Sequence, residues 1–437
     1  MNRLPVVEPR PYLLDNKIQH YAWGTKGERA FIPRLLGIEP EPGYPYAELW
    51  IGTHVRAPSD VIVRGSPISL RQLISQHPLE TLGDAVLSRF GETLPFLLKV
   101  LSAGEALSIQ VHPTREQAQV LNSRDPEHYP DDNHKPELAI ALDSLTALMG
   151  FKSFSGLLET LEQYPELTRF IGPSVYRRLS DSRERPYPEQ QGLVRSMYAT
   201  LVKRSIADQE ALGRVITHLD ERLNKSTGSL PEEARVFLDL RKTYPEPDVG
   251  LLSVFLMNLI HLEKGQAVFL KAGIPHAYLE GNIVECMANS DNVVRAGLTH
   301  KFKDVETLTE ILTYELGPVT ILESDPASHG CRAIGMAASD GALSAVTYQT
   351  DASEFQVSRM KIEPGREIHV RGSGPRILLL TEGEILIKWR SGPGDGPGDG
   401  KESLRQGQSV FIPACLREFQ ITSNSSTELF MAEVPSH

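Results

Sequence analysis

Cysteine is scarce in this chain: three residues, Cys286, Cys331 and Cys415, stand far apart among 437. An odd number of isolated cysteines excludes a disulfide framework and a zinc site built from thiolates. Such sparse usage is typical of proteins that work in a reducing compartment. We therefore expect a cytoplasmic protein.

The chain also lacks an excess of positive charge and lacks long apolar segments. Its 45 Lys and Arg residues face 56 Asp and Glu residues, for a formal net charge of −11. A surface of that sign disfavours nucleic acid and anionic membranes as general partners, but a local cluster of cations can still bind a small phosphorylated molecule. The most apolar run, Leu251 to Ile260, contains Asn258 and is too short to span a bilayer. We expect no nucleic-acid partner, no membrane partner and no signal peptide.

The residue pattern changes twice along the chain. Up to about residue 100, Pro, Gly and short apolar runs indicate strands and turns. From about 153 to 240 the apolar residues recur at helical spacing. Strand signals return after Gly265, with a Gly/Pro tract at 391–400 that we expect to be a flexible loop. The sequence predicts a mainly β protein of two or three domains with an inserted helical segment.

One short stretch carries the first sign of chemistry. Gln110 and His112 lie two residues apart in a run that reads as a strand, so their side chains leave the same face. An amide and an imidazole on an otherwise apolar strand are costly to bury without a partner. A divalent metal ion is one such partner, because imidazole and oxygen donors suit zinc. Water at a half-exposed strand is the other, and the pattern alone leaves both open.

Two further carboxylates are candidates for the same site: Glu137 follows the Gln110–His112 stretch in the sequence, and Glu48 precedes it. Thr114 and Gln117 form a capping-box pattern, which predicts that a short helix begins there. The stretch His134-Lys135-Pro136-Glu137 follows and leads into an alternating apolar segment, so Glu137 is expected at the end of a strand. Glu48 lies between apolar neighbours, where a carboxylate requires a cation or hydrogen-bond donors.

Two glycine-led patterns resemble the two halves of the cupin signature. They read Gly104-x5-Gln110-x-His112 and Gly265-x5-Lys271-x-Gly273-x2-His276. Cupins usually have His where this chain has Gln110, and Pro where it has Lys271.

A second, decayed copy of the signature lies near the end of the chain. It reads Gly365-x5-Arg371-x-Ser373 and Gly407-x5-Pro413-x-Cys415-x2-Glu418. Its ligand positions hold Arg, Ser and Glu, so a jelly roll without a metal is expected there. The resemblance implies a bicupin, that is, two jelly-roll β domains, with an inserted α-helical domain.

The implied division of the chain has four parts. Residues 1–152 form the N-terminal part of the catalytic cupin domain, and 153–250 form the helical insert. Residues 251–320 complete the catalytic domain and carry His276 and Arg295. Residues 321–437 form a degenerate cupin domain without metal.

Longer phrases resemble the type I phosphomannose isomerase family. They are residues 19–24, 46–53, 94–113, 129–142 and 276–302. The resemblance implies a zinc enzyme that interconverts D-mannose 6-phosphate and D-fructose 6-phosphate through an enediol intermediate. It further implies a role in supplying mannose for GDP-mannose and protein glycosylation. We expect a monomer that binds one zinc ion and a small sugar phosphate.

The resemblance also implies the metal ligands. In the family, zinc is bound by the Gln and His of Q-x-H, the Glu of H-K-P-E and the His of P-H-A-Y. These positions hold Gln110, His112, Glu137 and His276. Glu116 lies at the spacing that a simple cupin uses for its carboxylate, but its place on the predicted helix favours Glu137. The active-site arginine of the family falls on Arg295.

An aldose–ketose isomerisation also needs an acid/base within reach of C1 and C2. His134, Lys135 and Glu285 are the candidates. Each could instead have a structural role: His134 could donate a hydrogen bond to a metal ligand, and Lys135 could be a solvated turn residue. Glu285 could be the ion-pair partner of Arg295. His134 and Lys135 are preferred over Glu285, since Lys135 adjoins a ligand and nearby zinc would favour its neutral form.

Three further residues are candidates for substrate binding. Ser108 and Lys99 are possible donors to the phosphate group, and Ser108 shares a strand face with Gln110. Glu48 is the third. Arg295 is permanently charged, which suits electrostatic stabilisation or phosphate binding rather than proton transfer.

Two other classes of protein fit part of the pattern. A cupin oxygenase needs redox-active iron with open positions, and a fourth protein ligand at Gln110 argues against it. A sugar-phosphate sensor without catalysis should have lost a ligand or Arg295, and neither is lost.

Overall fold

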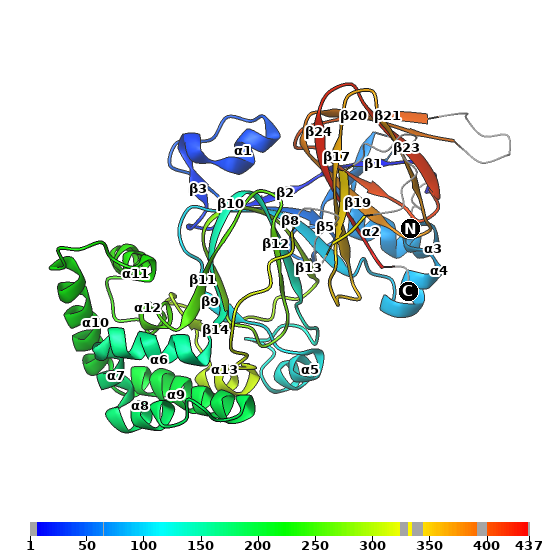
Figure 1. The fold of residues 1–437 in the computed structure, drawn as a ribbon. Helices are drawn as coiled ribbons and strands as arrows, with labels where there is room; N and C mark the ends of the chain where they lie inside the picture. Colours follow the sequence, from blue (N-terminus) through cyan, green and yellow to red (C-terminus); the bar gives the residue numbers. More distant parts are fainter. Residues whose placement is uncertain (1–6, 64, 324–330, 334–343, 391–399, 436–437) are drawn as a thin grey trace.

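The computed structural model describes residues 7–63, 65–323, 331–333, 344–390 and 400–435. The expected loop at 391–400 lies outside the described residues except for its last glycine. Within the described part, the chain forms two nine-stranded sheets, a four-stranded sheet and a two-stranded sheet, all with antiparallel pairing between the named strands, together with a set of helices. The β-rich architecture is therefore confirmed (Figure 1).

One nine-stranded sheet, in the middle of Figure 1, carries most of the residues expected to be functional. Its main path runs β11-β10-β13-β8-β5-β2, with β12, β9 and β14 attached. The strands are β2 (Lys17–Gln19), β5 (Glu48–Gly52), β8 (Phe96–Ala103), β9 (Ile109–Val111), β10 (Glu137–Phe151), β11 (Met257–Leu262), β12 (Ala267–Leu270), β13 (His276–Ala288) and β14 (Val294–Gly297).

Alternation along β10 confirms the prediction made from its sequence. Leu138, Ile140 and Leu142 enter one hydrophobic core, whereas Ala139 and Ala141 enter another on the opposite face. Because side chains alternate along a strand, this register places Glu137, the first residue of β10, on the alanine side.

The other nine-stranded sheet is built mainly from the C-terminal strands and runs β15-β16-β17-β24-β19-β22-β1-β6-β7; the four-stranded sheet runs β18-β23-β20-β21. The strands are β1 (Tyr12–Asp15), β6 (Asp60–Val63), β7 (Ser66–Ser69), β15 (Cys331–Ala333), β16 (Ser344–Tyr348), β17 (Gln356–Ile362), β18 (Glu367–Arg371), β19 (Arg376–Glu382), β20 (Glu384–Trp389), β21 (Gly400–Arg405), β22 (Ser409–Ile412), β23 (Glu418–Ser423) and β24 (Thr427–Glu433).

Strands from the start of the chain join this C-terminal sheet. Tyr12 of β1 pairs with Phe411 of β22, and β6 and β7 extend the same sheet. From the sequence, residues 1–152 were expected to belong to the catalytic unit alone, whereas β1, β6 and β7 pair within the C-terminal sheet. Strand alternation specifies which face of a strand is buried, but it does not specify the partner strand.

Helices fill the region that the sequence predicted to be helical and gather at one end of the central strands (Figure 1). They are α6 (Phe154–Gln163), α7 (Pro165–Ile171), α8 (Pro173–Ser180), α9 (Tyr187–Ala207), α10 (Gln209–Asn224), α11 (Glu232–Thr243) and α12 (Gly250–Ser253). Their apolar faces share one hydrophobic core with Ile109, Val111 and Val294 of the central sheet. The helical segment therefore packs directly on the strands that carry Gln110 and Arg295.

The remaining elements are short. They are η1 (Gly27–Arg29), α1 (Phe31–Leu36), α2 (Leu70–Gln76), α3 (Pro78–Leu82), α4 (Asp84–Phe90), α5 (Arg115–Arg124), α13 (Val305–Ile311) and the strand pair β3 (Thr25–Lys26) and β4 (Pro45–Tyr46). The predicted capping box is present: the Thr114 hydroxyl accepts from the Gln117 N–H, and the Gln117 side chain accepts from the Thr114 N–H. None of the helices in the described ranges has the length and apolar character to cross a membrane.

Candidate metal centre

The short strand β9 brings the two halves of the first glycine-led motif together. In the pairing register, Gln110 lies opposite His276 of β13 on one side and opposite Arg295 of β14 on the other. Residues directly opposite in an antiparallel pair have neighbouring side chains on the same face. Three residues that are far apart in the sequence are therefore neighbours at one spot in the sheet.

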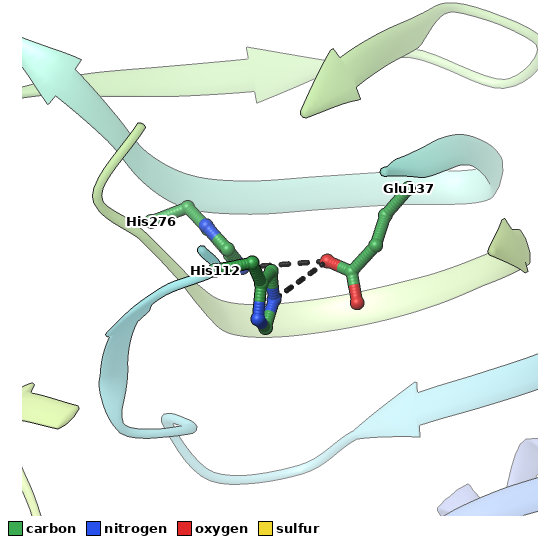
Figure 2. A group of neighbouring side chains, drawn as sticks. All are labelled: His112, Glu137 and His276. Carbon is green, nitrogen blue, oxygen red and sulfur yellow. Dashed lines mark ion pairs between the residues drawn. The ribbon is translucent and has the colours of Figure 1, made fainter. Parts of the chain in front are cut away.

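Beside this spot, His112, Glu137 and His276 converge on one point (Figure 2). Glu137 Oε2 lies 3.4 Å from His112 Nε2 and 3.4 Å from His276 Nε2. Their potential ligand atoms all lie within 4.8 Å of one another, close enough to share a metal ion. Gln110 Nε2 is 3.3 Å from His276 Nε2, so the amide adjoins the same point.

Backbone carbonyls orient both imidazole rings. His112 Nδ1 lies 2.8 Å from the carbonyl oxygen of Asn292, and His276 Nδ1 lies 3.0 Å from that of Ile274. A carbonyl accepts only from an N–H, so these contacts assign the proton to Nδ1 and leave each Nε2 as a lone-pair donor. Histidines that bind metals are commonly held in this way by a second hydrogen bond.

The protonation states also suit a metal. Burial lowers the pKa of His112 to about 4, against the opposing attraction of Glu137, so the imidazole is neutral at physiological pH. Burial alone would raise the pKa of Glu137, but the nearby charge of Lys135 holds it well below its usual value. Neutral imidazole and carboxylate are the forms that bind divalent ions.

Two buried atoms in this cluster have no hydrogen-bond partner, His112 Nε2 and Glu137 Oε2. Unsatisfied buried acceptors are costly, and both of these acceptors aim at the shared point. A cation at that point would satisfy both, so the donor set fits a metal ion. Glu116 lies exposed on α5, away from this cluster.

A cavity of about 760 Å³ opens beside the centre. Every residue expected to bind metal or substrate or to catalyse lines it, except His112, His134 and His276. His112 and His276 are 1% and 2% exposed, so they lie beneath the cavity wall. Of the four expected metal ligands, Glu137 and Gln110 are therefore the two that face the cavity.

His134 is directed elsewhere. Its Nε2 lies 2.8 Å from Glu354 Oε1 and 2.9 Å from Arg115 Nη2, in a cluster that the C-terminal part of the chain helps to form. Glu354 is almost completely buried and also binds Arg115 at 2.6 Å. Lys135, in contrast, lines the cavity and lies with its Nζ 3.0 Å from Glu137 Oε1.

A buried ion pair lines another part of the cavity. Lys99 Nζ donates to Glu285 Oε2 at 2.7 Å, and the Tyr278 hydroxyl donates to Glu285 Oε1 at 3.0 Å. Burial alone would lower the pKa of Lys99, but the carboxylates of Glu285 and Glu48 raise it. Both oxygens of Glu285 are occupied, so Lys99 and not Arg295 is its ion-pair partner.

Glu48 also has a partner, since the Trp50 indole N–H donates to its carboxylate. Neither Tyr278 nor Trp50 is among the site residues expected from the sequence, although both stand in the phrases that resemble the isomerase family.

Replacing Lys99 by Met is expected to lower the free energy of unfolding by roughly 3–5 kcal/mol, because it leaves the buried Glu285 carboxylate without its cation. Urea denaturation measures the loss. Lys271→Met is the matched control: its partner Asp351 is exposed, so the cost should be about 1 kcal/mol or less. Equal costs for the two variants would contradict this interpretation of the buried pair.

Two further cations that line the cavity have no carboxylate partner among the residues that the structure describes. They are Arg295 and Lys301. Burial and the charges of Arg295 and Arg56 lower the pKa of Lys301, so these cations lie close enough to repel one another. Unpaired cations beside a cavity favour binding of an anionic ligand.

A β-rich protein with a buried His–Glu–His cluster under a cation-lined cavity belongs, by fold and site, to the class of metal-binding proteins that take a small anionic ligand. The family model "Phosphomannose isomerase type I, catalytic domain" matches residues 12–154. Mannose-6-phosphate isomerase of Schizosaccharomyces pombe is 34% identical over 426 residues, which cover 95% of this chain and 97% of the relative. That of Saccharomyces cerevisiae is 36% identical and covers 86% of this chain and 89% of the relative.

Solved structures agree with the sequence relatives. A crystal structure of mannose 6-phosphate isomerase from Salmonella typhimurium, bound to substrate (fructose 6-phosphate) and zinc, superimposes with a TM-score of 0.79 at 28% identity; the match covers 98% of this chain and 100% of the other. This chain belongs to the mannose-6-phosphate isomerase family.

Proposed function

We propose that this chain interconverts D-mannose 6-phosphate and D-fructose 6-phosphate at one zinc ion. The observation that carries the proposal is the convergence of the orphaned His112 Nε2 and Glu137 Oε2 beside a cavity with the unpaired cations Arg295 and Lys301. These features support a metal site and a phosphate site at one cavity, as a phosphorylated sugar requires. Such an enzyme supplies mannose for GDP-mannose and protein glycosylation.

The zinc ligands we propose are Gln110, His112, Glu137 and His276. When bound, the ion stabilises, as a Lewis acid, the negative charge that develops on the substrate oxygens. One carboxylate among otherwise neutral ligands leaves net positive charge at the centre for that purpose. Gln110 and Glu137 face the cavity, so substrate approaches from their side.

We assign proton transfer between C1 and C2 to Lys135. Of the three candidates, it is the one that lines the cavity without being fully occupied by other groups. His134 is held by Glu354 outside the cavity lining, and both oxygens of Glu285 accept hydrogen bonds. Arg295 lies opposite Gln110 in the sheet, where its charge stabilises the enediolate or the phosphate.

The phosphate group is assigned to the side of the cavity that carries Arg295 and Lys301. Ser108 also lines the cavity and can donate a hydrogen bond to it. Lys99 is less suited to this task than the sequence indicated, because Glu285 already neutralises it. Glu48 and Trp50 complete the wall that meets the sugar.

Substitution of Lys135 by Met should slow turnover by roughly a hundredfold or more while zinc stays bound, since general acid–base catalysis contributes on that scale. In deuterated water the unaltered chain should place deuterium at C2 of mannose 6-phosphate or C1 of fructose 6-phosphate, and Lys135→Met should place less. Mass spectrometry of the products measures both.

His134→Ala is the matched comparison for that experiment. It should retain zinc and most of its turnover, because His134 faces Glu354. Exchange that is unchanged in Lys135→Met would move the assignment to Glu285. Products without any label over many turnovers would favour a direct hydride shift.

The bicupin architecture is part of this proposal. In the second copy of the motif, Arg371 lies opposite Glu418, at the positions that correspond to Gln110 and His276 in the first copy. The two side chains form an ion pair at 3.0 Å. Where the first copy has two proposed metal ligands, the second copy therefore has two side chains that neutralise each other without a metal. This correspondence supports two cupin units with the divisions 1–152, 153–250, 251–320 and 321–437, except that β1, β6 and β7 pair with the second unit.

We further propose that the chain acts as a monomer in the cytoplasm, without nucleic-acid or membrane partners. The net charge of −11 supports the absence of nucleic-acid and membrane partners, and the three isolated cysteines support the compartment. A mass of one chain in light scattering is expected, and a stable dimer would contradict the monomer.

A coupled assay tests the proposed function. Purified protein is supplied with mannose 6-phosphate, and fructose 6-phosphate is converted onward by a second enzyme whose product absorbs light. Steady formation of fructose 6-phosphate is expected from mannose 6-phosphate, and no product is expected from unphosphorylated mannose. Absence of product from zinc-loaded protein, or oxygen consumption in its place, would overturn the proposal.

A further inference from the structure

The helical insert meets the active site through the segment that joins α11 to α12. We propose that Asp248, in this segment, is a positioning residue through which the insert fixes residues 295–301 in the shape that the active site requires. The inference rests on the proposed isomerase function. It assigns a catalytic purpose to a part of the chain that contributes none of the proposed metal ligands.

The side chain of Asp248 accepts three hydrogen bonds from a buried position, with 7% of the residue exposed. Its Oδ1 accepts the backbone N–H of Leu298 at 2.7 Å and that of Gly250 at 2.7 Å. Its Oδ2 accepts from Lys303 Nζ at 3.2 Å. One carboxylate oxygen therefore links the backbone of the insert to the backbone just beyond Arg295.

The backbone at this link has little freedom to adjust. Leu298 has φ +53°, a conformation that is rare for residues other than glycine and persists only where the surroundings hold it. Gly297 packs on Gly250 so closely that an added Cβ would lie 2.5 Å from the Gly250 backbone. The hydrogen bond from Leu298 to Asp248 is thus part of what keeps an unusual turn in place.

The turn shapes the substrate cavity. Leu298, Thr299, His300 and Lys301 all line the 760 Å³ cavity, as does Arg295. The insert adds Tyr244 to the same wall, with its hydroxyl donating to the Ala106 carbonyl. Arg295 also borders a second cavity of about 240 Å³, which is lined in part by Val202, Ser205 and Val249 of the insert.

Through these contacts the insert determines where the two unpaired cations, Arg295 and Lys301, lie. Loss of the Asp248 acceptor would release the turn after Arg295 and let Arg295 and Lys301 move away from the substrate. Misplacement of a catalytic group by about 1 Å can reduce the rate up to about a hundredfold. Zinc binding should be unaffected, since Asp248 contacts none of the proposed ligands.

A double-mutant cycle with Arg295 tests the proposal. Asp248→Ala should lower kcat/KM for mannose 6-phosphate by roughly 10- to 100-fold, with zinc content equal to the unaltered chain. If Asp248 acts through Arg295 and Lys301, then Asp248→Ala combined with Arg295→Ala should lose clearly less than the product of the two single losses. Independent effects would multiply instead.

Two controls separate the hydrogen bonds from the charge. Asp248→Asn keeps an oxygen that accepts both N–H groups, so it should retain most of the activity that Asp248→Ala loses. Lys303→Met removes the ion pair and leaves the N–H contacts, so it should be as active as the unaltered chain. An Asp248→Asn variant as slow as Asp248→Ala would overturn the hydrogen-bond mechanism.

The outcomes distinguish this inference from the proposed function. An unaltered chain without isomerase activity would overturn the proposed function and this inference with it. An active chain whose Asp248→Ala variant has unchanged kcat and KM, or whose losses multiply with those of Arg295→Ala, would overturn the positioning role alone. If Asp248→Ala does not yield folded protein, the cycle is run with Asp248→Ser, whose shorter hydroxyl cannot reach both N–H groups.

Discussion

Replacing His276 by Ala is expected to remove both the bound zinc and the turnover of mannose 6-phosphate. The imidazole is buried, its Nδ1 is committed to the Ile274 carbonyl, and its Nε2 faces Glu137. Metal acting as a Lewis acid contributes several kcal/mol to the rate, so the loss should be on the order of a thousandfold or more. Zinc content and steady-state kinetics are measured on the same sample.

His369→Ala is the matched control, because His369 lies on β18 in the four-stranded sheet and pairs with Glu367. This variant should keep one zinc ion per chain and full turnover. A His276→Ala variant that binds zinc as tightly as the unaltered chain would remove His276 from the ligand set.

Replacing Arg295 by Ala is expected to have the second largest effect and a different signature. Zinc should remain bound, because Arg295 is adjacent to Gln110 without being part of the His–Glu–His cluster. Turnover should fall by roughly 100- to 1000-fold, the usual cost of removing one group that stabilises charge in the transition state. Metal analysis, kcat and KM together report this pattern.

Arg371→Ala provides the comparison, since Arg371 occupies the corresponding strand of the second motif copy and forms an exposed pair with Glu418. It should leave turnover unchanged. Loss of zinc from Arg295→Ala would show that the arginine supports the metal site itself, in contrast to the role assigned here.

Local sequence patterns predicted the features that depend on neighbouring residues. The two-residue spacing placed Gln110 on a strand, the alternation after Glu137 placed that residue at a strand end, and Thr114 marked the start of α5. The short glycine-led motifs also indicated that His276 and Gln110 belong to one signature, and the register of β9 and β13 places the two residues opposite each other.

Contacts between distant segments were not accessible in the same way. Glu354 reaches His134 across 220 positions, and Asp248 reaches Leu298 across 50. Nothing in the residues around a lone carboxylate specifies which distant donor it will meet, because that depends on how the sheets and the insert pack. For this reason the sequence could name His134 as a candidate base, whereas its partner in the folded chain removes it from the cavity lining.

The pairing of Lys99 with Glu285 illustrates the same limit. The sequence offered Lys99 as a phosphate donor and Glu285 as a partner of Arg295, since each is plausible when only charge is considered. Strands β8 and β13 place Lys99 and Glu285 directly opposite each other, so they neutralise one another. Arg295 and Lys301 are left for an anionic ligand.

Titration of metal-free protein with zinc tests the central claim most directly. Chelator-treated protein receives increasing amounts of zinc, and bound zinc and turnover of mannose 6-phosphate are measured at each step. Turnover should be absent at the start, rise in proportion to bound zinc and level off at one zinc ion per chain. Full turnover in protein without metal, or zinc-loaded protein that produces no fructose 6-phosphate, would contradict the account.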